Sequence, residues 1–109
     1  MPSASNPPVE GGTFQFLLPA TKDGIPWDIT GGSVSVVFTR KDGTQFAVTG
    51  SVISAPAAYI ALGYTTIGQY TTLVTDLNQY GTWSVAWTVV LGSITAPFGP
   101  AIFTVRRAS

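Results

Sequence analysis

The sequence has 109 residues, no cysteine and no histidine, and five basic side chains balance five acidic ones. This length fits one domain, and the missing residue types exclude disulfides, thiol chemistry and the commonest general base and metal ligand. A net charge of zero gives no long-range attraction for nucleic acid or an anionic membrane. We therefore expect neither of these partners, no catalytic residue, no cofactor and no metal ligand set.

The first residues are expected to form an arm. Prolines, Pro7 and Pro8 among them, oppose a helix and interrupt strand pairing over residues 1–12. This arm is expected to be flexible or extended along a neighbouring protein, which makes both prolines candidate interface residues. A single β domain is expected over residues 13–106, followed by a short tail at 107–109.

Alternating apolar and polar residues predict about seven short antiparallel strands, with turn signals at roughly 8–12-residue spacing and no helix of useful length. Asp-Gly pairs at Asp23-Gly24 and Asp42-Gly43 predict tight turns, and the second of these predicts a hairpin. Gly50 is a candidate bulge within one strand. The strands are expected at residues 13–19, 25–29, 33–39, 45–53, 69–75, 82–91 and 101–106.

The strand that begins after Gly81 carries the heaviest apolar face. Trp83 and Trp87 alternate with polar residues, so both indoles are expected to face inward between two sheets. A carbohydrate-stacking platform is the alternative for these two residues. Thr95–Pro100 is expected as loop or edge, and the Asp76–Tyr80 corner as one turn of 3₁₀ helix, with the Tyr80 hydroxyl bonding back to the backbone.

In residues 54–68 the apolar residues do not recur with a clear helical or strand period. Ala57–Leu62 alternates weakly, which predicts a loop with a strand fragment. The basic pairs Arg40-Lys41 and Arg106-Arg107 are expected to be solvated, one at a hairpin tip and one in the tail.

The order of these elements resembles a phage immunoglobulin-like module. The resemblance rests on the turn at Lys22–Gly24, the Pro-Trp-Asp-Ile-Thr-Gly-Gly step at 26–32, the hairpin start at 33–44, and the Gly-aromatic strands at 68–71, 81–85 and 99–105. Over about residues 13–106 the chain is similar to the N-terminal domain of siphophage baseplate upper proteins and to small virion proteins, including capsid decoration proteins. The longer 54–67 segment departs from this family's pattern. The resemblance implies an immunoglobulin-like β-sandwich without catalysis.

The same resemblance implies a structural or attachment role in a tailed-phage virion, after synthesis in the bacterial host cytoplasm. Capsid-surface decoration is expected first, because no coiled coil or receptor module accompanies the β domain. Tail or baseplate attachment is the alternative, followed by a carbohydrate-binding module. The expected partners are other virion proteins, with the chain bound as a homo-oligomer or on a lattice, and a glycan remains open.

Exposed aromatic and apolar side chains supply the remaining interface candidates. Tyrosine and tryptophan bury large areas at low conformational cost, so they suit binding surfaces. Asp23, Asp28 and Asp42 offer a calcium site as an alternative, although they lack the dense ligand loop of such sites. The interface candidates outside the arm are Trp27, Tyr59, Ile60 and Tyr64.

Overall fold

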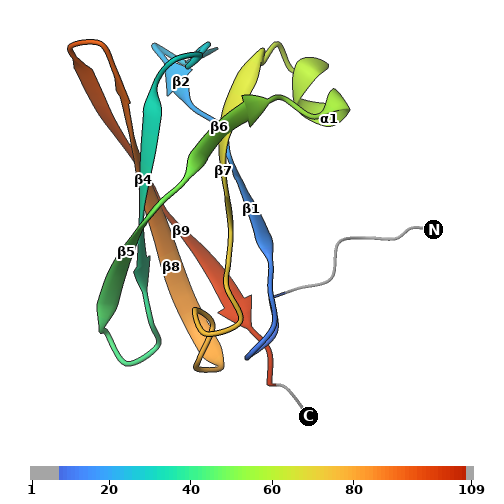
Figure 1. Cartoon of the computed structure of the whole chain (residues 1–109), viewed down its shortest axis with the longest axis vertical. Coiled ribbons are helices and arrows are strands. Elements are labelled where there is room, and N and C mark those ends of the chain that lie inside the picture. Colours follow the sequence, from blue (N-terminus) through green and yellow to red (C-terminus); the bar gives the residue numbers. More distant parts are fainter. Residues whose placement is uncertain (1–7, 108–109) are drawn as a thin grey trace.

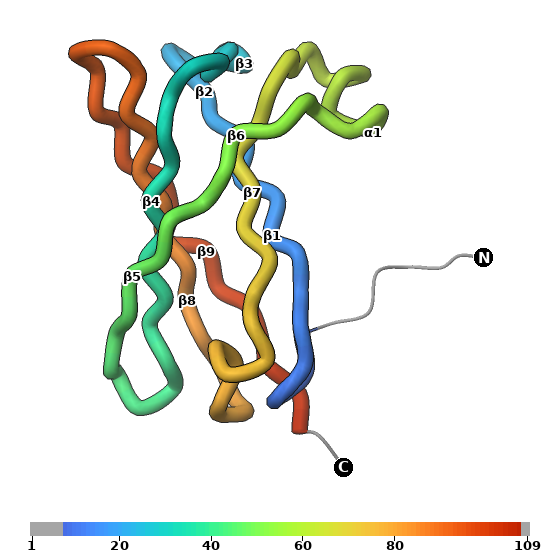
Figure 2. The backbone as a smooth tube through the Cα atoms, in the orientation of Figure 1, coloured from blue at the N-terminus to red at the C-terminus, as the bar shows by residue number. Residues whose placement is uncertain are grey.

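A computed structural model describes residues 8–107, which form antiparallel sheets around one core (Figures 1 and 2). One sheet has the order β1-β7-β6, built from β1 (Gln15–Leu18), β7 (Thr66–Thr71) and β6 (Ser51–Ser54). The other has the order β5-β4-β8-β9, built from β5 (Gln45–Thr49), β4 (Ser33–Thr39), β8 (Gly81–Leu91) and β9 (Ile94–Val105). A small hairpin, β2 (Thr21–Lys22) and β3 (Ile25–Pro26), and a short helix, α1 (Ala57–Ile60), complete the described chain.

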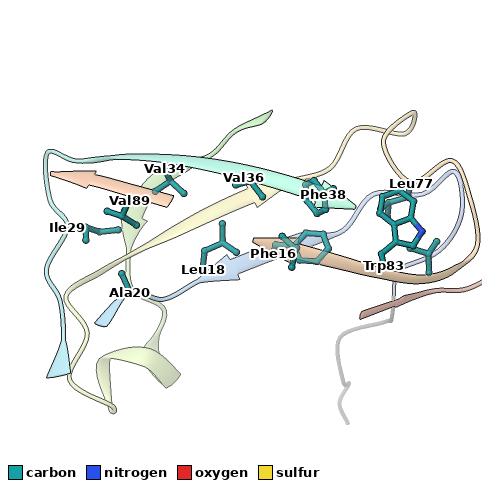
Figure 3. Close-up of a cluster of buried hydrophobic side chains, with 12 residues drawn as sticks. Phe16, Leu18, Ala20, Ile29, Val34, Val36, Phe38, Leu77, Trp83 and Val89 are labelled. Atoms are coloured by element: carbon teal, nitrogen blue, oxygen red, sulfur yellow. The ribbon is translucent and has the colours of Figure 1, made fainter. Parts of the chain in front are cut away.

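The core lies between the two sheets, where alternate residues of the strands meet (Figure 3). On β4 the inward residues Val34, Val36 and Phe38 are fully buried, and the residues between them, Ser35 and Val37, are on the opposite face, as the alternation predicts. Aromatic rings fill the centre. Phe38 packs edge-on against Phe16 and Trp83, with ring centroids 5.3 and 6.4 Å apart. Both sheets therefore depend on the same aromatic cluster.

The two indoles of β8 both pack against the core, but to different depths. Trp83 is 1% exposed, and its Nε1 donates a hydrogen bond to the Gln79 carbonyl at 3.1 Å. Trp87 is half-buried and stacks on Phe98, with ring centroids 6.0 Å apart, and its buried Nε1 has no acceptor among residues 8–107. The inward placement predicted for this face is thus confirmed, and Trp83 is its deeply buried member.

Gly50 is where the chain passes from one sheet to the other. Its N–H donates to the Val34 carbonyl of β4 at 2.8 Å, whereas the next residue, Ser51, pairs with Gln69 of β7. A Cβ atom at Gly50 would lie 2.8 Å from the Gln69 carbonyl oxygen and 3.3 Å from Val34. The predicted strand at 45–53 is therefore two strands in two sheets, and the candidate bulge is a crossing point that only glycine fits.

Several other predicted boundaries were wrong. The strand fragment expected in Ala57–Leu62 is α1, which begins after Pro56 and is followed by turns. Alanine favours a helix, and the Pro56 carbonyl accepts from both Tyr59 and Ile60. The last strand was expected at 101–106, but β9 begins at Ile94 and pairs with β8 through a register shift between Val85 and Trp87. Residues 95–100, expected as loop or edge, thus belong to an edge strand, so the edge alternative is confirmed.

The corner after β7 ends that strand earlier than predicted and contains a turn in place of the expected 3₁₀ helix. Asp76 accepts hydrogen bonds from the Tyr70 hydroxyl at 2.6 Å and from the Leu73 N–H at 2.8 Å. The side chain that fastens this corner is therefore Tyr70. Tyr80, which was expected to do so, is 43% exposed.

This corner makes stability sensitive to alkaline pH. Burial, and then the hydrogen bond to the Asp76 carboxylate, raises the pKa of Tyr70 from 10 to about 12. The unfolded chain releases this proton near pH 10, whereas the folded chain retains it, so the contribution of Tyr70 is complete below pH 10 and is lost as pH rises towards 12. We expect Tyr70→Phe to cost about 1–2 kcal/mol near neutral pH.

Urea unfolding at a series of pH values, followed by circular dichroism, tests this expectation. Wild type should lose more stability than Tyr70→Phe between neutral pH and alkaline pH. Parallel losses in the two proteins would show that Tyr70 is not the responsible group.

Candidate interaction surface

Asp28 and Asp42 accept hydrogen bonds both from nearby residues and from residues distant in the sequence. Asp28 accepts from the hydroxyl and N–H of Thr30 and from the Thr66 hydroxyl, in that order of effect, which lowers its pKa. The Thr44 hydroxyl, then the Thr44 N–H and Gln79, lower the pKa of Asp42 to about 2. Within residues 8–107, no three His, Cys, Asp or Glu side chains gather as a metal site would require. The calcium alternative therefore finds no geometric support.

The β2–β3 hairpin and α1 lie at the same end of the molecule (Figure 1), and exposed apolar side chains occur in the hairpin, in α1 and in the turn after it. Ile25, Ile60 and Leu62 are 65%, 59% and 66% exposed, which is unusual for aliphatic residues so close together along two adjoining segments. We call this set the α1 surface, and it consists of Ile25, Trp27, Tyr59, Ile60, Leu62 and Tyr64.

Specific contacts hold the two halves of the α1 surface together. A Cβ atom at Gly63 would lie only 3.4 Å from the Pro26 side chain, so the turn after α1 lies against β3. The Thr66 hydroxyl donates to Asp28 at 2.9 Å and accepts from the Ile29 N–H at 2.9 Å. These contacts join residues almost 40 positions apart in the chain, as the separations of 37 and 38 show. The surface is thus fixed by tertiary structure.

The segment around α1 is also ordered within itself. The rings of Tyr59 and Tyr64 meet edge to face, with centroids 5.8 Å apart and planes at 77°. The Tyr64 N–H donates to the Tyr59 carbonyl at 3.0 Å, and the Ala55 N–H donates to the Thr65 carbonyl at 3.0 Å. A partner would therefore meet a preformed shape.

The predicted interface residues differ in how exposed they are. Ile60 is exposed, and Tyr59 and Tyr64 are half-buried within the α1 surface. Trp27 is half-buried and packs against the core, and its backbone N–H donates to the Ala20 carbonyl. Leu62 and Ile25, which the sequence analysis missed, are the most exposed members, and their position beside turn glycines was the only available signal.

The predicted arm is only partly described. Pro7 lies outside the described residues. Pro8 is buried, and its carbonyl accepts from the Arg106 N–H at 2.9 Å, so Pro8 is not an exposed contact residue as expected. Val9 forms a parallel bridge with Arg106, and Gly11 donates to the Leu77 carbonyl at 2.8 Å. Residues 8–12 thus extend along the body of their own chain.

The opposite end of the molecule brings together two basic segments that were expected to be separate. Lys41 Nζ lies 5.2 Å, and Arg107 Cζ 5.1 Å, from the centroid of the Tyr80 ring. Arg40 covers the Phe46 ring at 4.5 Å. Leu73 and Val74 are also exposed at the adjoining corner. This end therefore mixes charge with apolar surface.

Comparison of the chain with protein-family models, curated proteins and solved structures found no match. Within the described part of the chain, no helix is long and apolar enough to cross a membrane.

Proposed function

We propose that this chain is a non-enzymatic structural protein of a tailed-phage particle, which binds a repeating protein surface of the virion through the α1 surface. Capsid-surface decoration is the first form of this proposal, and tail or baseplate attachment is the second. The similarity of the sequence to phage immunoglobulin-like virion modules supports both forms.

The strand order supports an immunoglobulin-like β-sandwich as the fold behind this role. In such sandwiches a sheet of order C′-C-F-G faces a sheet that contains B, E and D. The order β5-β4-β8-β9 fits the first sheet, and β1-β7-β6 fits the second. Folds of this kind leave loops and strand edges at the ends free for contacts.

The observation that carries the functional proposal is the exposure of Ile25, Ile60 and Leu62 on an ordered surface. Burying one such side chain against a partner is worth about 1.5–3 kcal/mol. Lys22 and Asp23 lie beside Ile25 on the β2–β3 hairpin, which resembles the polar rim around an apolar interface centre. A protein partner with an apolar patch therefore suits this surface better than a charged one.

The carbohydrate alternative fits the geometry less well. Stacking on a sugar needs an open, flat aromatic face, but Tyr59 and Tyr64 meet nearly at right angles. Trp27 packs against the core, so much of its ring is not free.

A sedimentation experiment tests the proposal. The purified protein is mixed with capsids, and separately with tails, of the phage whose genome carries this sequence, prepared without the protein. We expect the wild type to co-sediment with one of them, and the double variant Ile60→Asp/Leu62→Asp to bind at least about tenfold more weakly, because two charges replace apolar contacts.

Ile102→Asp is the matched control, since Ile102 is 69% exposed on β9, away from the α1 surface, and should bind as wild type does. Capsid binding and tail binding separate the two forms of the proposal. Absence of binding to either fraction, or wild-type binding by the double variant, would refute it.

A further inference from the structure

Among the described residues 8–107, the outer edge of β5 carries unpaired backbone groups, since β5 is an edge strand of its sheet and pairs there only with β4. The Arg40 N–H donates to the Thr44 carbonyl, and the Gly50 N–H to the Val34 carbonyl, both at 2.8 Å. In an antiparallel pair, hydrogen-bonded residues alternate along the strand. The even-numbered residues of β5 therefore bond to β4, and the odd-numbered residues direct their N–H and C=O groups away from the sheet.

Those outward-directed residues are Gln45, Ala47 and Thr49, and the side chains of all three are exposed. They present three donors and three acceptors in a row, in the geometry that another strand would need. No charge and no proline occurs in Gln45–Thr49.

The other edges are less suited to strand addition. Natural proteins protect sheet edges with proline, charge, short length or a covering segment. β9 contains Pro97 and Pro100, and its end is bridged by Val9. β1 and β6 have only four residues each, and Pro19 and Pro56 follow closely after them. β5 has five residues and contains neither proline nor a charged residue, and the Arg40 side chain lies over its inward Phe46 ring.

We propose that β5 pairs with β5 of a second copy of this chain. The two strands run antiparallel about a twofold axis at Ala47, which joins two four-stranded sheets into one continuous sheet. Gln45 then faces Thr49 of the second copy, and Ala47 faces Ala47. Because of the twofold axis, Thr49 also faces Gln45 of the second copy, which makes three residue pairs. Each pair exchanges two hydrogen bonds, about six in all.

A second copy is the partner that the strand itself fits. In a twofold contact the strand pairs with an identical strand, so charges of one sign would lie close to the same charges of the second copy, and Gln45–Thr49 contains no charge. The small Ala47 side chain sits at the axis, where a large one would meet itself.

The inward side chains are also complementary. Phe46 and Val48 are both half-buried at the open edge of the core. In the proposed register Phe46 lies opposite Val48 of the second copy, in the non-hydrogen-bonded pairs where side chains approach most closely. Association thus covers apolar surface that the single copy leaves partly exposed.

This contact is independent of the proposed function. β5 and α1 lie at opposite corners of the molecule in Figure 1, so a dimer keeps both α1 surfaces free. Because one short strand buries less than a standard interface of about 800 Å² per partner, we expect a dissociation constant of roughly 10–100 µM.

Analytical ultracentrifugation from low micromolar to about 1 mM protein tests the proposal. Wild type should dimerise with rising concentration. Ala47→Lys and Ala47→Glu should each raise the dissociation constant at least about tenfold, because like charges then meet at the axis. An equimolar mixture of the two variants should dimerise again, because opposite charges meet.

Thr104→Lys is the matched control, because it adds the same charge at an exposed site on β9 and should dimerise as wild type does. Three results would each overturn the proposal: a wild type that stays monomeric at about 1 mM, an Ala47→Lys variant that dimerises like wild type, or a mixture that associates no better than its components.

Discussion

Replacing Trp83 with alanine should lower the free energy of unfolding by about 3–5 kcal/mol, the largest loss expected for one side chain in this protein. The indole is 1% exposed, contacts Phe38, Phe46 and Phe103, and donates to the Gln79 carbonyl. The substitution therefore leaves a large cavity at the centre of the core and an unpaired carbonyl beside it. Since the free energy of unfolding of a small domain is only about 5–15 kcal/mol, this substitution removes much of the stability.

Two milder substitutions, Trp83→Phe and Trp87→Phe, test whether the deeply buried indole stabilises the fold more than the half-buried one. Trp83→Phe loses the bond to Gln79 and part of the ring, so it should cost clearly more than Trp87→Phe. Trp87 Nε1 is buried without an acceptor, and removing it should be close to neutral. Urea unfolding followed by far-ultraviolet circular dichroism measures each variant. Equal losses for the two Trp→Phe variants would contradict this assignment of roles.

Replacing Gly50 with valine should cost about 3 kcal/mol. Any Cβ at this position would lie 2.8 Å from a backbone oxygen of β7, and the branched side chain would also press on Val34 of β4. Neither neighbour is the free end of a flexible side chain, so one of the two sheets must shift. Both strands that leave Gly50 would lose part of their register.

Thr49→Val provides the control for this prediction. It places the same side chain one residue earlier, at an exposed position of β5, and should change stability by no more than about 0.5 kcal/mol. Urea unfolding followed by circular dichroism, at a protein concentration low enough to keep both variants monomeric, measures their free energies of unfolding. Equal stability of Gly50→Val and wild type would show that the two sheets can separate at this point without cost.

Local alternation predicted most of the strands correctly. The β4 strand and its inward residues were predicted without error, as was the turn at Asp23-Gly24, and the strand that contains Trp83 was predicted to within one residue. These features depend on neighbouring residues only. Asp23 and Gly24 both have positive φ values, 55° and 77°, which is the backbone requirement of the turn that Asp-Gly favours.

The change of sheet at Gly50 could not be read from the same alternation. Phe46, Val48 and Val52 all pack against the core, although the first two lie in one sheet and the third in the other. Because the sheets enclose the same core, the inward period continues unbroken through the crossing. The α1 helix was missed for a related reason, since a short apolar run fits a strand and a helix equally well.

The residue types of the α1 surface were partly predicted, but their assembly was not. Tyr59, Ile60 and Tyr64 were identified because aromatic and apolar residues suit interfaces. The placement of their segment against β3 depends on the approach of Gly63 to Pro26 and on the hydrogen bonds of Thr66. Contacts between residues so distant in sequence leave no periodic trace in a single chain.

The crossing at Gly50 has a mechanical consequence. The continuous segment from β5 through β6 leads directly into α1, so it connects the two regions to which we assign binding partners. A tensile force between those partners would travel along the covalent backbone of this one segment, so it need not pass through the side-chain packing between the two sheets.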